Sequence, residues 1–167
     1  HRDQPTLCAF EQVLPSAMGR LFEQEYCVVS ELMEAPEHPC TFVLGGAKIA
    51  DAFMMMETVL SRGIADQILT GGLVANIFLL ALGKEIGQGS ADFVEKSNYS
   101  EFIPRAAALY AQYGEKITLP QDLAWVSEGE RCEAVLGSIP ADVVALRDDV
   151  VIDFVVVRDD GTRVQVD

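Results

Sequence analysis

The chain has 167 residues, half of them hydrophobic, and 26 acidic against 12 basic residues give it a net charge of −14 and an isoelectric point of about 4.4. This length and hydrophobic content predict one well-buried domain, with or without part of a second, and exclude a disordered chain. The acidity argues against a nucleic-acid backbone or an anionic membrane as partner.

Two further absences in the sequence narrow the class of protein. The four cysteines form no CxxC pair, and the two histidines are far apart, so neither a zinc site nor a disulfide framework is predicted. We expect buried, reduced thiols and a cytoplasmic location. No run reaches the roughly 18 apolar residues that would span a bilayer. The cysteines are Cys8, Cys27, Cys40 and Cys132, and the histidines are His1 and His38.

The first part of the chain predicts one long helix. Residues 1–9 are expected to form an extended arm. Apolar residues then recur at three- and four-residue steps over residues 10–35, which is typical of an amphipathic helix. Pro15 is expected in its first turn, and Pro36 and Pro39 end it.

Two similar strand–turn–helix units follow. Strands over residues 41–44 and 67–70 each run into a pair of glycines, and each pair leads into a helix, over residues 47–60 and 73–82. Strands joined through helices of this length must be parallel, with right-handed crossovers. Both glycine pairs, Gly45-Gly46 and Gly71-Gly72, are therefore expected at the carboxyl edge of one sheet, where ligands bind in open α/β sheets.

The second half changes character along its length. We expect a loop over residues 84–93, a helix over residues 99–113 and short strands over residues 117–119 and 123–126. Beyond Ser127 the chain is β-rich, and Asp160-Gly161 lies between two alternating runs, which predicts a terminal hairpin. Ile103, Ala107, Leu109 and Tyr110 are expected to face inward, and further strands are expected over residues 132–136, 143–146 and 150–157.

The predicted fold class is α/β: a three-layer Rossmann-like parallel sheet with flanking helices, plus a β-rich C-terminal segment. Three parts are expected. Residues 1–38 form an arm and a long interdomain-type helix, residues 39–126 a partial nucleotide-binding domain, and residues 127–167 a β-rich tail with a terminal hairpin.

The glycine pairs carry the predicted chemistry. Two glycines after a strand let the backbone turn sharply and leave its N–H groups unshielded, while the following helix directs its positive dipole end the same way. An anion fits there. Lys48 adds a positive charge, although Asp51 could pair with it as an ordinary surface partner. The spacing matches neither a P-loop nor a dinucleotide fingerprint. Met54, Met55 and Met56 are expected to fill the core.

Several motifs in order carry a resemblance to a known family. GGAK with Asp51 three residues on, then LTGGLVANIFLLALGKEIG, then ITLPQDLAW resemble the phosphoglycerate kinase family, particularly its archaeal branch. The opening HRDQPTLCAFEQVLPSAMGRLFEQE is similar to the segment that ends the family's amino-terminal domain and enters its interdomain helix. The likeness covers residues 1 to about 126, and it identifies a partial chain.

The resemblance implies a monomeric two-domain kinase that moves a phosphoryl group between 1,3-bisphosphoglycerate and ADP, giving 3-phosphoglycerate and ATP, with Mg2+. It places His1 and Arg2 at 3-phosphoglycerate, and Gly45, Gly46, Ala47 and Lys48 at the nucleotide phosphates. It places Gly71 and Gly72 near the adenine and ribose, and it assigns no catalytic residue here.

The chain also departs from the family. The family's second lysine is Ala52 here, and its later glycine-rich loop with the magnesium-binding acid is missing, so we expect this piece to be inactive alone. The alternative hypothesis is a non-catalytic α/β interaction module, in which the glycine pairs are only tight turns. Its β-rich tail would mediate protein contacts, including self-association.

Overall fold

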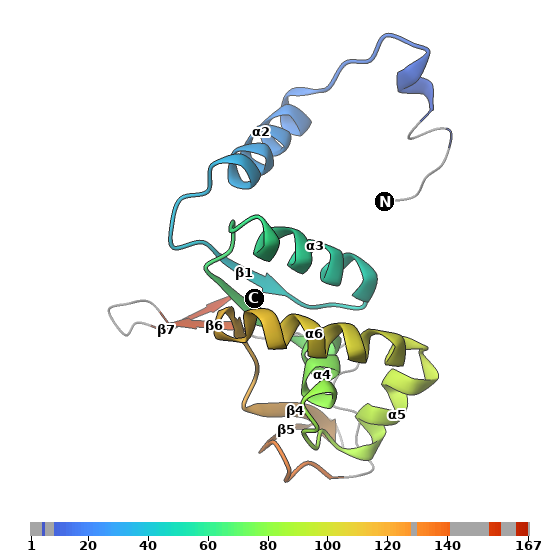
Figure 1. Ribbon diagram of the computed structural model, residues 1–167, viewed down its shortest axis with the longest axis vertical. Helices are drawn as coiled ribbons and strands as arrows, with labels where there is room; N and C mark the ends of the chain where they lie inside the picture. The colour runs from blue at the N-terminus through green and yellow to red at the C-terminus, as the bar shows by residue number, and fades with distance from the viewer. Residues whose placement is uncertain (1–4, 6–8, 128–129, 141–153, 158–162, 167) are drawn as a thin grey trace. The chain divides into compact units, whose positions relative to one another are not determined.

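A computed structural model describes residues 5, 9–127, 130–140, 154–157 and 163–166 (Figure 1). The chain divides into two compact units, His1–Glu37 and His38–Asp167. No helix in the described ranges is long and apolar enough to cross a membrane.

Residues 9–37 of the first unit contain a 3-10 turn, η1 (Phe10–Gln12), and the helix α2 (Arg20–Glu34). The prediction of a single helix over residues 10–35 is wrong over its first half. Pro15 has no backbone N–H and disfavours helical geometry in the residue before it, and Gly19 stands in extended conformation at the N-cap of α2. The helix ends at Glu34 with Ala35 as its C-cap, just ahead of Pro36 as expected.

The predicted extended arm is also wrong where the structure describes it. The N–H of Ala9 donates to the carbonyl oxygen of Pro5 at 3.1 Å, which is the spacing of a helical turn. Residues 1–4 and 6–8 lie outside the described residues.

The second unit is built on a parallel sheet of three strands, in the order β1 (Thr41–Leu44), β2 (Gln67–Thr70) and β3 (Ile117–Thr118). Each strand pairs in parallel with its neighbour. The structure confirms the predicted α/β class, a parallel sheet flanked by helices, and the bounds of the first two strands.

The sheet has one core face. Ile68 pairs in register with Phe42 and Ile117, and Ile68 is fully buried. The next row points to the opposite face because successive strand residues alternate. In that row Val43 pairs with Leu69, and Val43 is 45% exposed.

The helices of this unit are α3 (Ile49–Ser61), α4 (Gly72–Ala81), α5 (Gln88–Lys96) and α6 (Ile103–Tyr113), with 3-10 turns η2 (Tyr99–Phe102) and η3 (Gly114–Lys116). The loop predicted over residues 84–93 is wrong, because α5 occupies its second half. Ser90 and Val94 are buried one helical turn apart on α5. Gly87, Gly89 and Ser90 are typical of loops, so the helical spacing of the buried residues was not recognised in the sequence.

Aromatic contacts join three of these helical segments. The Phe53 ring of α3 stacks on Phe78 of α4 with centroids 5.5 Å apart, and Phe102 of η2 lies 5.3 Å from Phe53. Of the three consecutive methionines on α3, Met56 is fully buried, whereas Met54 and Met55 are exposed. Successive helix residues project about 100° apart, so three in a row cannot all face one core.

The inward face of α6 is only partly as predicted. Leu109 is buried as expected, and so is Ala106, which the sequence reading missed. Ile103, Ala107 and Tyr110 are half-buried.

Two antiparallel strand pairs complete the described elements. β4 (Asp122–Ser127) pairs with β5 (Glu130–Val135), and β6 (Phe154–Val157) pairs with β7 (Arg163–Val166), in agreement with the predicted terminal hairpin. Leu123 of β4 joins Leu79 and Ile86 in a buried cluster. Asp160-Gly161 and the strand predicted over residues 143–146 lie outside the described residues.

Candidate functional site

Both glycine pairs lie at the carboxyl edge of the sheet. Leu44 and Thr70 are register partners at the ends of two parallel strands, so Gly45 and Gly71 leave the sheet at the same level. The N–H of Gly71 donates to the carbonyl oxygen of Leu44 at 3.0 Å. The structure thus brings together Gly45, Gly46, Ala47, Lys48, Gly71 and Gly72.

Local geometry accounts for glycine at these positions. A Cβ on Gly45 would stand 3.3 Å from the carbonyl oxygen of Gly71 and 3.4 Å from its carbonyl carbon. Gly46 and Gly72 have φ values of +87° and +57°, a region that other residues rarely adopt. One glycine permits a close backbone approach and the other two permit the turns.

The amino-terminal end of α3 offers groups that attract an anion. Lys48 is its N-cap residue, and no side chain caps the first amides of the helix. These amides have no partner within the helix and stand at its positive dipole end. The Lys48 side chain is exposed. Amides and one ammonium group can therefore act on the same anion.

The second helix begins at the same edge. Gly71 is the N-cap of α4 in extended conformation, with no side-chain cap and no acidic residue in the first turn. Residues Leu73 to Leu79 of this helix are all buried, so α4 is firmly packed behind its own first turn. At the end of the neighbouring strand, the Thr70 hydroxyl donates to the carbonyl oxygen of Thr118 at 3.0 Å, which ties β3 to this edge.

A residue that the sequence reading did not single out reaches the turn before α3. The Tyr99 hydroxyl donates to the carbonyl oxygen of Ala47 at 3.3 Å, from a position 52 residues further along the chain. No motif or period in the sequence connects these two positions.

An ion pair braces the helix that carries Lys48. Arg105 of α6 donates from Nε and Nη2 to the two carboxylate oxygens of Glu57 on α3, each at 2.5 Å. This double hydrogen bond lowers the pKa of Glu57 and raises that of Arg105 from their ordinary values. The guanidinium carbon also lies 5.7 Å from the Phe53 ring centroid.

The resemblance also singled out His1, Arg2 and position 52. His1 and Arg2 lie outside the described residues. Ala52, where the family has its second lysine, is 8% exposed and sits in the first part of α3.

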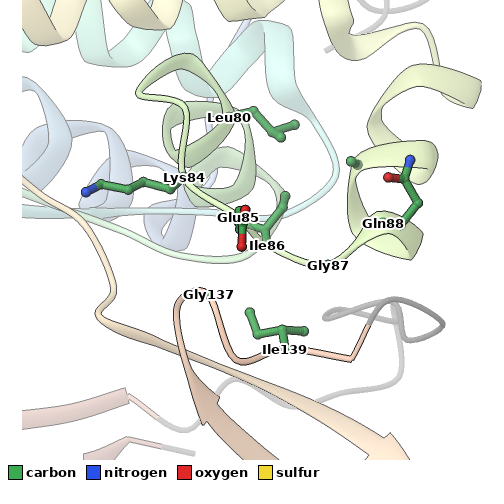
Figure 2. Close-up of a pocket in the computed structure, with 9 residues that line it drawn as sticks. Leu80, Lys84, Glu85, Ile86, Gly87, Gln88, Gly137 and Ile139 are labelled. Atoms are coloured by element: carbon green, nitrogen blue, oxygen red, sulfur yellow. The ribbon is translucent and has the colours of Figure 1, made fainter.

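A separate open cleft of about 320 Å³ lies at the other end of α4 (Figure 2). None of the predicted site residues lines it. The N–H of Gly137 donates to the carbonyl oxygen of Glu85 at 3.2 Å across this region, and Figure 2 shows Lys84 extending away from Gln88 and Ile139. Its lining residues are Leu80, Lys84, Glu85, Ile86, Gly87, Gln88, Ala91, Gly137 and Ile139.

Comparisons with known proteins agree on one family. A family model described as phosphoglycerate kinase matches residues 1–153. The chain is 44% identical over 140 residues to a phosphoglycerate kinase of Methanothermus fervidus, and 41% identical over 140 residues to one of Halobacterium salinarum; each match covers 84% of this chain. The crystal structure of phosphoglycerate kinase from Pyrococcus horikoshii OT3 superposes with a TM-score of 0.75 at 37% identity, over 81% of this chain.

These matches cover only part of each relative. The aligned region makes up 34% of the Methanothermus protein, 35% of the Halobacterium protein and 33% of the Pyrococcus chain. The chain therefore spans about a third of the length of the relatives that it matches.

Proposed function

The chain belongs to the phosphoglycerate kinase family, and from this premise we propose that it carries the nucleotide half-site of that enzyme. The complete reaction would move a phosphoryl group between 1,3-bisphosphoglycerate and ADP, giving 3-phosphoglycerate and ATP. In this proposal the chain supplies the surface that holds ADP or ATP, and it is inactive by itself.

One observation carries the proposal: the two glycine pairs stand side by side at the carboxyl edge of parallel strands. Catalysis of phosphoryl transfer relies mainly on positioning and on positive groups that neutralise the charge of the phosphates. The exposed turn at Gly46 and Ala47, together with the ammonium group of Lys48, supplies both the positioning and the positive charge.

The proposed roles follow from this arrangement. Gly45, Gly46, Ala47 and Lys48 hold the nucleotide phosphates, and the turn at Gly71-Gly72 takes the adenine and ribose. His1 and Arg2 would contact 3-phosphoglycerate, a role that rests on the family resemblance alone. Because Ala52 carries no charge, phosphate binding here depends more heavily on Lys48 than in relatives with two lysines.

Mg2+ enters the proposal with ADP, where it neutralises part of the phosphate charge. Across the described residues, no group of three or more His, Cys, Asp or Glu side chains is arranged to hold a metal ion. No step is therefore assigned to a metal held by this chain.

A cytoplasmic location is part of the proposal. Cysteines of proteins in a reducing compartment usually stay unpaired. The prediction that the cysteines are buried is confirmed for Cys40 and wrong for Cys27, which is exposed, while Cys132 is half-buried. The division into residues 1–38, 39–126 and 127–167 also remains a proposal, to be tested by limited proteolysis of the chain.

Binding of MgADP tests the proposed function. We expect MgADP to raise the melting temperature of the 167-residue chain, since a ligand at 100 times its Kd stabilises the folded state by about 2.7 kcal/mol. Lys48→Ala should abolish most of this rise, because hydrogen bonds to charged groups contribute about 1.5–3 kcal/mol. Lys84→Ala, which removes an exposed lysine of the separate cleft, is the matched control and should leave the rise intact.

The alternative module gives the opposite result. If MgADP leaves the melting temperature unchanged, the glycine pairs are only tight connections, and the proposal is wrong. Robust ATP formation by the chain alone in a coupled assay would contradict the proposed inactivity. Self-association through the β-rich tail is tested separately, by sedimentation of the full chain and of one truncated before residue 150.

A further inference from the structure

The Tyr99–Ala47 hydrogen bond connects two segments that no sequence motif links. Tyr99 opens η2, the 3-10 turn between α5 and α6, and its hydroxyl donates to the Ala47 carbonyl oxygen in the turn between β1 and α3. In Figure 1 the segment that joins α5 to α6 lies beside the amino-terminal end of α3.

We propose that Tyr99 is a positioning residue for the phosphate-binding turn. By holding the Ala47 carbonyl group, it fixes the Ala47–Lys48 peptide in the orientation that binds nucleotide phosphates. The inference rests on the proposed function, and it adds a residue that the glycine–lysine motif does not include.

Peptide geometry explains why one carbonyl contact has this effect. In a planar trans peptide the C=O and N–H bonds point in opposite directions. A hydroxyl bonded to the Ala47 oxygen therefore directs the Lys48 N–H away from Tyr99. The same restraint limits rotation of the peptide that precedes Lys48, and so narrows the directions in which the lysine side chain can start. Lys48 adopts φ −91° and ψ 71° there, outside helical geometry.

The turn is loosely packed at Gly46, although Gly45 at its start is held against Gly71. Gly45, Gly46, Ala47 and Lys48 are all exposed, and a Cβ on Gly46 would meet no atom within 4 Å. Close packing therefore does not fix this peptide. In an exposed turn that contains a glycine with positive φ, one hydrogen bond to a distant element changes the distribution of backbone orientations substantially.

Tyr99 is itself held by its own turn. Phe102, at the other end of η2, lies 5.3 Å from the Phe53 ring of α3, and Arg105 one turn later pairs with Glu57 of the same helix. Asn98, just before the turn, has φ +60°, which sets the sharp entry into η2. Residues 99–105 therefore contact the side of α3 through Phe102 and Arg105, and they contact the turn between β1 and α3 through the Tyr99 hydroxyl.

The substitution Tyr99→Phe tests the inference, because it removes only the hydroxyl. We expect the Kd for MgADP, measured by calorimetry well below the melting temperature, to rise about three- to tenfold, the range that one uncharged hydrogen bond accounts for. Binding of adenosine, which has no phosphates, should not change. Tyr110→Phe removes a tyrosine hydroxyl from α6 and is the matched control; its Kd for MgADP should equal that of wild type.

A second measurement needs no ligand. The NMR order parameter of the Lys48 N–H should fall in Tyr99→Phe and stay unchanged in Tyr110→Phe. If wild type binds MgADP and Tyr99→Phe binds it equally well, the positioning role is wrong while the proposed function stands. If wild type does not bind MgADP, the proposed function itself fails. Equal losses in both tyrosine variants, or an equal loss for adenosine, would mean a general structural effect and would overturn the inference.

Discussion

Gly45 and Gly71 approach so closely that a Cβ on Gly45 would stand 3.3 Å from the carbonyl oxygen of Gly71. The contact is backbone against backbone, at the point where two parallel strands end and two helices begin. Because the Gly71 N–H also bonds the Leu44 carbonyl oxygen, neither turn can move away without breaking the edge of the sheet. The spacing of the two turns is therefore a property of the backbone rather than of side chains.

Gly45→Ala should destabilise the chain by about 1–3 kcal/mol, the usual cost of forcing an extra methyl group into a packed position. Gly114→Ala is the control, because a Cβ there meets the Tyr110 ring at the same 3.3 Å, and a side chain can move aside. It should be neutral or slightly stabilising. Urea unfolding of both variants measures the difference, and equal costs would contradict this account of Gly45.

Gly46→Ala should separate stability from binding. Gly46 and Gly63 both have positive φ with open space around them, at +87° and +70°. Each substitution to alanine should cost about 1–2 kcal/mol of folding free energy, since an L side chain is strained in this region. Only Gly46→Ala should also weaken MgADP binding, measured by calorimetry. Equal affinities in the two variants would remove Gly46 from the proposed site.

The Glu57–Arg105 pair should show measurable coupling. A double-mutant cycle with Glu57→Gln and Arg105→Ala should give about 0.5–1 kcal/mol, near the upper end for partly exposed ion pairs, because the contact is bidentate. The Asp92–Lys96 pair, with its lysine 78% exposed and a 3.5 Å contact, is the control and should give less. Coupling no larger than that of the control would argue against a bracing role for Arg105.

Asp66 should make stability depend on pH in the acid range. Its pKa is lowered from the ordinary 3.8 because its carboxylate accepts hydrogen bonds from His38 and from the Cys40 N–H. A lowered folded-state pKa means that this stabilisation is complete above pH 3.8 and is lost as the pH falls through the folded-state value. Urea midpoints of wild type should exceed those of Asp66→Asn at pH 7, and the gap should close towards pH 2.

The control for that series is Glu115→Gln, an exposed substitution on η3. Its unfolding midpoint should stay close to that of wild type across the whole pH range. A gap between wild type and Asp66→Asn that persists unchanged at pH 2 would show that the carboxylate charge is not the cause.

Much of the second unit could be predicted from the sequence. The strands at residues 41–44 and 67–70, their parallel pairing and the common edge of the two glycine pairs all follow from rules that act within about 30 residues, the length of one strand–helix–strand unit. The resemblance to the family was also visible in the sequence, because the glycine–lysine motif and its successors stand in order along the chain, and the family model matches residues 1–153.

The errors have local causes that periodicity alone does not weigh correctly. Pro15 and Gly19 shortened the helix predicted over residues 10–35, since a repeating apolar pattern continued across residues that disfavour helix. In α5 the reverse happened: glycines and a serine resembled a loop, while burial of Ser90 and Val94 formed a helix. In each case the apolar pattern and the backbone preferences disagreed, and the sequence reading followed the wrong one.

By itself, the sequence determined which residues turn at the sheet edge and which charge stands beside them, because strand length, crossover length and glycine backbone freedom are local properties. Only the tertiary structure decided what holds that turn. The Tyr99 hydroxyl meets the Ala47 carbonyl group across 52 residues, and it does so because Phe102 packs on Phe53 and Arg105 pairs with Glu57. Such a contact leaves no period or motif in the chain, since it exists only once distant helices have packed together.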